Sequence, residues 1–529
     1  MVEPSSNGIA GRIVRAAGAQ GINQLARVGQ LFLLVPICLG SWGTATYEDW
    51  LLVNSVTAFL VLADLGYTQF TTVKLIDAWS RGDRERFARE WGIALAIFAA
   101  LSAVLAVVFA LAWIAPAWAS LIPVRQLPQR QLASITVLLS IGLLSGEWIG
   151  LGLGAYRARG DLSRSYHVSS IYVAAQTAGI AIPAALGEGP VGSASGSCLV
   201  SVVMLLCVVA DFAFRYPDMA WKPIWPPREE LLRRVRDSVG YLISPIATTI
   251  FVNAPNLILA STGAPEGAIA LFGTTRTIAG VARQLPYQFA HPAGVELAGL
   301  LARGVRGDLS RLYENASRAL AIVVGVLSGF TVVAAPLVMA LWTRGKVTYD
   351  PYLMLLLVGT TAICAPAQVA ITLLWYGGFP GLLNRALIFS TVLSMGLSIL
   401  LAPFFQVHGV AIGLGVGEIA AIAVYLALLV DRLLERKPGI DLARNFGVSL
   451  LTFAASAAGS YLLYRVIDPH GWFDLVEFGC AWSIPGAAGL FWLLPSSAQQ
   501  ARAIATMVSF VRSKRARWRL KNANPADYG

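Results

Sequence analysis

Among the charged residues in the long apolar stretches of this 529-residue chain, six are of types and at positions that could bind anions or cations. They are Arg27, Arg276, Arg283, Asp64, Glu147 and Glu418. Arginine binds phosphate through two parallel N–H donors, and a carboxylate inside an apolar helix can take up a proton or a sodium ion. Because a charge in such a helix is costly unless it faces a partner or water, each residue indicates either a binding site or a structural pair.

Polar side chains accompany the arginines on the same helix faces. In the stretch 18–40 they recur at intervals of three and four residues, which places them on one side of a helix. In the stretch 266–291, Arg276 and Arg283 are seven residues apart and therefore lie nearly one above the other. With Asp64, the three arginines carry a formal charge of about +2, which favours an anion. The candidate anion-binding residues are Arg27, Arg276, Arg283, Gln20, Asn23, Gln24, Asn54 and Gln284.

Structural roles compete with these assignments. Arg27 and Arg283 could extend to the membrane surface, and Arg276 could pair with Asp64 or Glu296. Asp64 could instead accept hydrogen bonds from neighbouring backbone. The candidate ion-coupling residues, each with a structural alternative, are Asp64, Glu147 and Glu418.

The composition predicts the helices that carry these residues. The chain is 56% hydrophobic and 13% charged, whereas soluble domains carry about 25% charged residues. The apolar stretches are continuous, unlike the alternating strands of a membrane barrel, and about 20 residues suffice to span a bilayer. We therefore predict an all-α polytopic membrane protein with about fourteen helices. The predicted spans are 18–40, 49–72, 91–121, 132–155, 166–186, 190–212, 238–261, 266–291, 318–342, 351–376, 385–404, 409–430, 446–464 and 475–494.

The connecting segments alternate between Arg-rich and nearly Arg/Lys-free, which predicts that the N- and C-termini are both cytoplasmic. This alternation also explains the formal charge of +11, so we expect no nucleic acid partner. The outer loops are too short to hold the catalytic groups of a glycosyltransferase or polysaccharide polymerase. The basic residues on the predicted outer side are Arg125, Arg130, Arg344, Lys346 and Arg465.

Cysteine and histidine usage indicates neither a disulfide nor a metal centre. The five cysteines lie in or beside apolar runs without CxxC spacing, and the four histidines are scattered. We expect no metal, no catalytic residue and no cofactor apart from an H⁺ or Na⁺ coupling ion.

Two similar phrases suggest two halves. RGDRER (81–86) follows the second predicted span and RGDLSR (306–311) follows the eighth, six spans later. A third copy, RGDLSR (159–164), follows the fourth span, and the phrase is also explained by Gly ending one helix, Asp capping the next and Arg keeping the loop inside. Because the two phrases are separated by an even number of spans, both halves would have the same orientation in the membrane. This is an architecture of secondary transporters, whose binding site lies between the halves. The predicted regions are a cytoplasmic N-terminus (1–17), an N-lobe of helices 1–6 (18–212), a cytoplasmic linker (213–237), a C-lobe of helices 7–12 (238–430), helices 13–14 (446–494) and a basic cytoplasmic tail (495–529).

One segment carries a family resemblance. After an Arg-bearing first helix comes YEDWLLVNSVTAFLVLADLGYTQFTTVKLIDAWSRGD (47–83), with Trp near its start, then Asp-Leu-Gly, then a basic Gly-Asp loop. In this order and layout the chain resembles Wzx-type polysaccharide flippases (PST/RfbX-like) of the MOP exporter superfamily. The resemblance implies two six-helix bundles, as in MOP, MurJ and MATE proteins, plus two C-terminal helices.

The resemblance also implies a function. Similar proteins move undecaprenyl-diphosphate-linked oligosaccharides of O-antigen (lipopolysaccharide), capsule or exopolysaccharide from the cytoplasmic to the periplasmic leaflet of the bacterial inner membrane. The lipid bilayer, a polysaccharide polymerase and a chain-length regulator are the further partners it implies. Related lipid II flippases use cavity arginines in helices that match those of Arg27 and Arg276, although here Asp64 stands where those relatives carry more arginines. The alternative is a MATE-like cation or drug antiporter, which would require acids in its cavity.

Overall fold

The computed structural model describes residues 6–64, 66–216, 222–302, 306–436 and 439–493, and the regular structure in these ranges is entirely helical. Ten segments of this part are long and apolar enough to cross a membrane. The prediction of an all-α polytopic membrane protein is therefore confirmed. The predicted basic tail, 495–529, lies outside the described residues.

The element bounds are as follows. The helices are α1 (Ser6–Trp42), α2 (Thr44–Ala58), η1 (Phe59–Asp64), α3 (Tyr67–Ser80), α4 (Arg84–Ile114), η2 (Pro116–Leu121), α5 (Gln129–Ala158), α6 (Leu162–Ala185), α7 (Gly189–Arg215), α8 (Arg228–Ser261), α9 (Ala268–Ala302), α10 (Arg306–Thr343), α11 (Pro351–Cys364), η3 (Ala365–Ala367), α12 (Gln368–Tyr376), α13 (Pro380–Glu418), η4 (Ile419–Leu426), α14 (Ala427–Leu433), α15 (Ile440–Ile467) and α16 (Trp472–Leu493).

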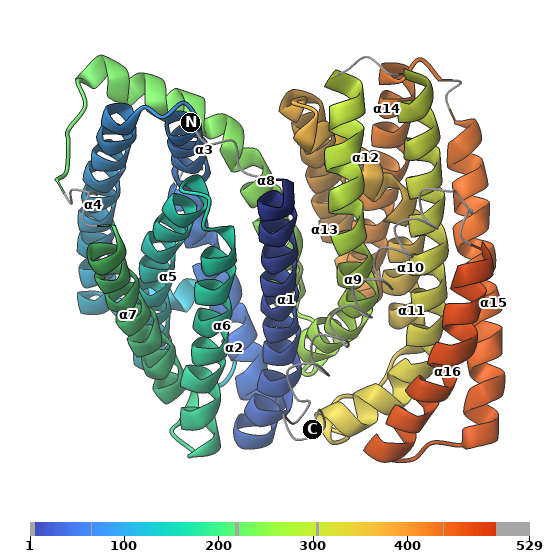
Figure 1. The fold of residues 1–529 in the computed structure, drawn as a ribbon. Coiled ribbons are helices and arrows are strands. Elements are labelled where there is room, and N and C mark those ends of the chain that lie inside the picture. Colours follow the sequence, from blue (N-terminus) through green and yellow to red (C-terminus); the bar gives the residue numbers. More distant parts are fainter. Residues whose placement is uncertain (1–5, 65, 217–221, 303–305, 437–438, 494–529) are drawn as a thin grey trace, which may run out of the picture.

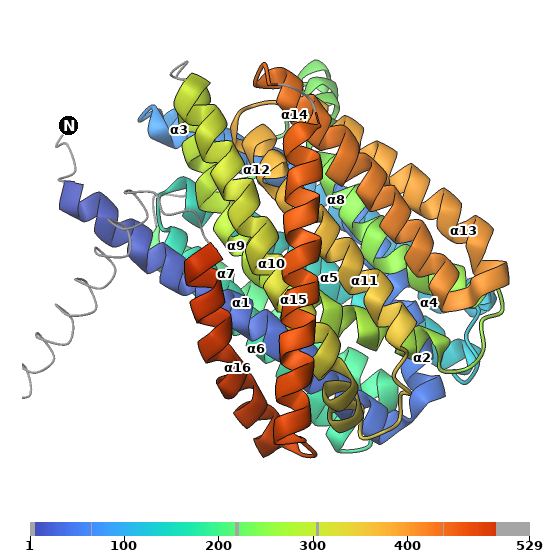
Figure 2. The same ribbon diagram turned by 90° about the vertical axis from the view of Figure 1, so that its right-hand side faces the viewer.

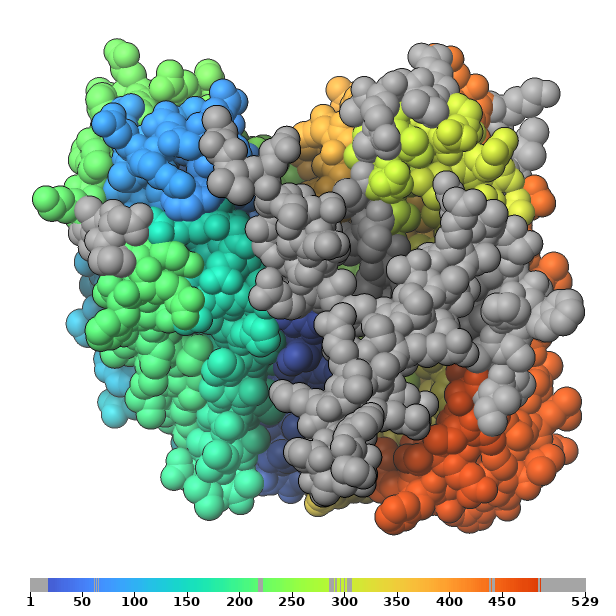
Figure 3. Space-filling view, in the orientation of Figure 1, coloured from blue at the N-terminus to red at the C-terminus, as the bar shows by residue number. Residues whose placement is uncertain are grey.

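The helices form two groups side by side, which we call the N-terminal group (α1–α7) and the C-terminal group (α9–α16) (Figure 1). Helix α1 stands between them and packs along α6. Helix α8 contacts both groups, with α2 and α3 on one side and α13 on the other. Helices α15 and α16 lie on the outside of the C-terminal group, and α15 packs along α10 (Figure 2). The two groups are parted at the end where α8 begins (Figure 3).

The prediction of one continuous helix over 49–72 is wrong. The chain forms α2, then the 3-10 helix η1, and restarts as α3 after Gly66, whose φ is +71°. A Cβ atom on Gly66 would lie 2.8 Å from the Ser238 carbonyl oxygen, so the break lets the backbone of α8 approach closely. Asp64 closes the break because its carboxylate accepts hydrogen bonds from the Thr68 backbone N–H (3.1 Å) and hydroxyl (3.1 Å).

The predicted spans 385–404 and 409–430 are two helices in the structure, which share the label α13 and pack against each other through the hydroxyls of Ser394 and Ser398, donating to the Leu414 and Val410 carbonyls. The backbone kinks between the two helices at Gln406, whose φ of 48° is not helical, and the second helix continues through η4 into α14. This explains part of the difference between about fourteen predicted spans and ten membrane-length segments, since Pro380–Leu433 accounts for two predicted spans. Added Cβ atoms on Gly413 and Gly417 would clash with Ser398 and Ser394, so the glycines allow the two halves of α13 to pack closely.

Candidate anion-binding site between the two helix groups

The polar face of α1 forms one side of the site. Asn23 is buried, and its side-chain amide donates to the hydroxyls of Ser169 (2.9 Å) and Ser170 (3.4 Å) on α6. Its amide oxygen accepts a hydrogen bond from the Arg27 Nε, at 3.1 Å. Asn23 therefore links α1 to α6 and orients the arginine one turn away.

Arg27 is the most available cation of this face. Its side chain is exposed, and among the described residues the Asn23 amide oxygen is its hydrogen-bond partner. The two terminal guanidinium nitrogens therefore remain able to donate to a ligand. Because the anchor is a neutral amide, the full positive charge of Arg27 is retained.

The same face reaches the C-terminal group. Gln24 donates to the Gln284 side-chain oxygen on α9 at 2.7 Å, which joins α1 to α9 at this point. Gln20, one turn before Gln24, is half-buried. The structure thus brings together candidates separated by 260 residues, while Asn54 donates to the Trp50 carbonyl of its own helix at 2.8 Å.

Arg276 is held by backbone oxygens. Its two terminal nitrogens donate to the Phe251 and Val252 carbonyls of α8, each at 2.8 Å, and the guanidinium carbon lies 5.2 Å from the centre of the Phe251 ring. In the part of the chain that the structure describes, no carboxylate pairs with Arg276, neither Asp64 nor Glu296. Arg276 therefore also keeps its full charge.

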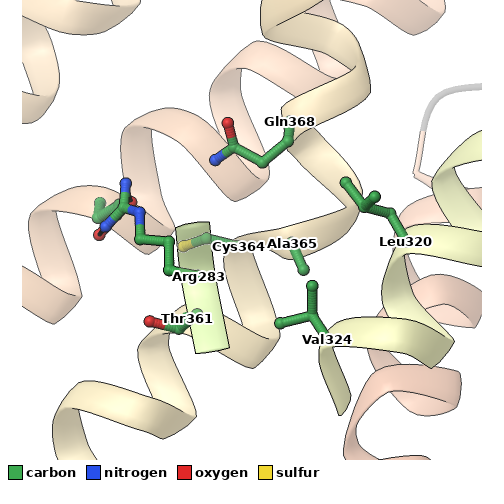
Figure 4. Close-up of a pocket in the computed structure, with 8 residues that line it drawn as sticks. Arg283, Leu320, Val324, Thr361, Cys364, Ala365 and Gln368 are labelled. Atoms are coloured by element: carbon green, nitrogen blue, oxygen red, sulfur yellow. Dashed lines mark hydrogen bonds and ion pairs between the residues drawn. The ribbon is translucent and has the colours of Figure 1, made fainter. Parts of the chain in front are cut away.

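Arg283 differs, because it forms a two-point ion pair with Glu418. Its Nη2 lies 2.6 Å from Oε1 and its Nη1 lies 3.2 Å from Oε2. The Glu418 side chain is buried, whereas that of Arg283 is 33% exposed. The two residues line a pocket with Thr361, Cys364 and Gln368, shown in Figure 4. Two residues that the sequence analysis assigned to different roles are thus partners.

The three arginines are therefore unequal. Arg27 and Arg276 contribute one positive charge each, while the charges of Arg283 and Glu418 cancel, which leaves a formal charge of +2. A diphosphate diester carries two negative charges, and guanidinium groups bind phosphate oxygens in pairs. A formal charge of +2 favours an anion over a cation.

Asp64 and Glu147 lie elsewhere, in a second pocket within the N-terminal group. Leucine and phenylalanine side chains form most of its lining, with Phe98 and Phe109 among them. The structure brings these two ion-coupling candidates together and separates both from Glu418. One carboxylate, Asp64, also closes the start of α3, as the alternative for that residue anticipated.

The sequence analysis missed a set of contacts at the predicted outer end. Glu48 of α2 is buried, and its carboxylate accepts from the backbone N–H groups of Ile269 (2.8 Å) and Ala270 (3.1 Å) at the start of α9. A carboxylate at this position stabilises the positive end of the α9 dipole. The Arg125 side chain adds a hydrogen bond to the Ala264 carbonyl.

A second contact at this end has the opposite polarity. Lys346, in the loop after α10, donates to the Leu39 carbonyl (2.6 Å) near the end of α1, and Trp342 donates to the Phe32 carbonyl (2.8 Å). A cation thus binds the negative end of α1 while a carboxylate binds the positive end of α9. These contacts hold the two groups together at the predicted outer end. The acids of the YEDW phrase were the available sequence signal, and Lys346 is one of the five basic residues on the predicted outer side, to which no role was assigned.

Comparisons with known proteins identify the fold. No protein-family model and no curated protein matches the sequence. Among solved structures, the chain resembles a lipid II flippase, MurJ, in an inward closed conformation, with TM-score 0.66 and 11% identity over 88% of this chain and 98% of the other. It also resembles a multidrug resistance MATE transporter of the MOP superfamily in an inward-facing conformation, with TM-score 0.60 and 17% identity over 84% and 99%.

A further similar structure is a MOP superfamily transporter from Pyrococcus furiosus, with TM-score 0.56 and 17% identity over 84% of this chain and 96% of the other. At these identities the comparisons establish the fold and leave the cargo open. The chain has the fold of MOP-superfamily transporters.

Proposed function

We propose that this protein is a flippase for an undecaprenyl-diphosphate-linked oligosaccharide, moving it from the cytoplasmic to the periplasmic leaflet of a bacterial inner membrane. The observation that carries the proposal is the pair Arg27 and Arg276. Both arginines are anchored to neutral oxygen atoms, and they lie on two helices, α1 and α9, that touch through Gln24 and Gln284. A diphosphate is the headgroup that such a pair of uncompensated guanidinium groups fits.

The contacts at the two ends of the molecule suggest how the cargo moves. Glu48 and Lys346 join the groups at the predicted outer end, and the groups are parted at the predicted cytoplasmic end. The headgroup would enter from the cytoplasm, bind Arg27 and Arg276, and leave after the groups rock, while the lipid tail stays in the bilayer. The membrane potential assists, because moving one negative charge outward gains about 2.3 kcal/mol per 100 mV. The return of the empty, positively charged site to the cytoplasmic side works against the same field. We therefore propose that the return is coupled to H⁺ or Na⁺ through Asp64, Glu147 or Glu418.

The test is substitution of the two arginines in the purified full-length protein. Arg27→Ala and Arg276→Ala should each weaken binding of undecaprenyl diphosphate in nanodiscs by about tenfold or more. Arg311→Ala, which removes an exposed arginine of α10, is the matched control and should bind as the wild type does. Wild-type affinity in both variants, at normal folding, would refute the anion site. Flipping of a lipid-linked oligosaccharide in proteoliposomes then tests the cargo.

One observation favours a second function, efflux of an organic cation. The pocket of Asp64 and Glu147 combines two carboxylates with the rings of Phe98 and Phe109. Carboxylates pair with a positive charge and aromatic rings contact organic cations, so this lining suits a cation with apolar groups. In that case Asp64→Asn and Glu147→Gln would abolish drug resistance in a sensitive host, and the arginine variants would not. The reverse pattern supports the flippase.

A further inference from the structure

Helix α8 contains a proline at the point where Arg276 binds it. Pro255 lies inside α8 and is buried. Proline has no backbone N–H, so the carbonyl four residues earlier, that of Phe251, loses its helical partner. This is one of the two carbonyls to which Arg276 donates, at 2.8 Å. An unpaired carbonyl at membrane depth is costly, and the guanidinium of Arg276 satisfies it.

The adjacent carbonyl and ring complete the cradle. Val252 provides the second acceptor, at 2.8 Å from the other terminal nitrogen, and the Phe251 ring lies 5.2 Å from the guanidinium carbon. All of these groups are neutral. The cradle therefore fixes the direction of Arg276 without cancelling its charge, in contrast to Arg283, which Glu418 neutralises.

We propose that Pro255 is a positioning residue for the anion site: by leaving the Phe251 carbonyl free, it creates the acceptor that aims Arg276 at a diphosphate headgroup. This inference rests on the proposed function. Pro255 need not touch the ligand, and its effect passes through Arg276. Substituting alanine restores the missing N–H, which can close the helical hydrogen bond to Phe251 and displace the guanidinium from its acceptor.

The same helix offers a matched control. Pro245 is also inside α8, and its missing N–H frees the carbonyl of Tyr241. Arg276 binds the carbonyls of Phe251 and Val252, which come ten and eleven residues after Tyr241. Pro245→Ala therefore makes the same chemical change to the helix without altering the acceptors of Arg276.

The experiment measures binding of undecaprenyl diphosphate to the full-length protein in nanodiscs for Pro255→Ala, Pro245→Ala, Arg276→Ala and the double variant Pro255→Ala/Arg276→Ala. We expect Pro255→Ala to weaken binding roughly fivefold to tenfold, Pro245→Ala to leave it unchanged, and the double variant to match Arg276→Ala. Size-exclusion profiles check folding of each variant.

Three results would overturn the proposal. Pro255→Ala could bind like Pro245→Ala, which removes the positioning role. The two substitutions could add in the double variant, which shows that Pro255 acts on the helix and not through Arg276. If Arg276→Ala binds undecaprenyl diphosphate as the wild type does, Arg276 has no part in the anion site, and the proposed function is refuted as well. If Arg276→Ala binds more weakly but Pro255→Ala does not, only the role of Pro255 is refuted.

Discussion

Arg283 of α9 and Glu418 at the end of α13 are joined by a two-point ion pair, with nitrogen–oxygen distances of 2.6 and 3.2 Å. The pair ties together two helices of the C-terminal group and removes one arginine from the charge available to a ligand. Arg27 and Arg276 have no carboxylate partner among the described residues, and they are the two arginines of the proposed anion site.

Breaking this pair on one side should destabilise the protein. Arg283→Met leaves the buried carboxylate of Glu418 without its cation, at a cost of roughly 2 kcal/mol, reduced from that of a fully buried pair because Arg283 is 33% exposed. The double variant Arg283→Met/Glu418→Leu should recover most of the loss. Thermal unfolding in detergent measures both, and a double variant less stable than the single one would contradict this account.

An exposed pair provides the control. Asp77 on α3 and Arg81, directly after its end, form an ion pair at the surface, 2.7 Å apart. The Arg81 guanidinium, which donates to the carboxylate, lowers the pKa of Asp77. Asp77→Asn should leave the unfolding temperature unchanged, since solvent screens such pairs.

The anchor of Arg27 gives a prediction about charge. Asn23→Asp keeps the shape of the side chain but places a carboxylate beside the guanidinium, 3.1 Å from Nε in the wild type. Binding of undecaprenyl diphosphate should weaken about tenfold, because the arginine is neutralised. Asn23→Ala removes the anchor and the hydrogen bonds to Ser169 and Ser170 but adds no charge, and it should weaken binding about threefold. The opposite order would show that the orientation of Arg27 matters more than its charge.

Two adjacent acids allow a sharp test of the outer contacts. Glu48 accepts from Ile269 and Ala270 across the two groups, whereas Asp49 accepts from backbone N–H groups of residues 125–127 within the N-terminal group. Glu48→Ala should speed hydrogen exchange at 269–270 roughly fivefold, which corresponds to about 1 kcal/mol. Asp49→Ala should instead speed exchange at 125–127. Unchanged exchange at 269–270 in Glu48→Ala would mean that this carboxylate does not hold the ends together.

The pocket of Asp64 and Glu147 predicts a phenotype of its own. Asp64 and Glu147 share a pocket that Arg27 and Arg276 do not line. Glu147→Gln should therefore leave the affinity for undecaprenyl diphosphate intact and change the response of transport to an imposed pH or Na⁺ gradient in proteoliposomes. If this variant loses lipid binding and retains the gradient response, the coupling role belongs elsewhere.

The sequence by itself determined the helical membrane fold and the polar face of α1. Apolar length and charge content act locally, so they can be read along the chain. The spacing of Asn23, Gln24 and Arg27 likewise predicted one helix face, because helical geometry depends only on residue separation.

Tertiary structure alone decided which charges remain available. Arg283 and Glu418 are 135 residues apart, and nothing in either segment specifies that α9 and α13 place them within 2.6 Å. The break at Gly66 depends equally on the close approach of α8, and the anchoring of Arg276 depends on carbonyls of that helix. The type of a side chain sets what it can bind. The packing of helices that are distant in the sequence sets which intramolecular partner it binds, and therefore whether its charge is available to a ligand.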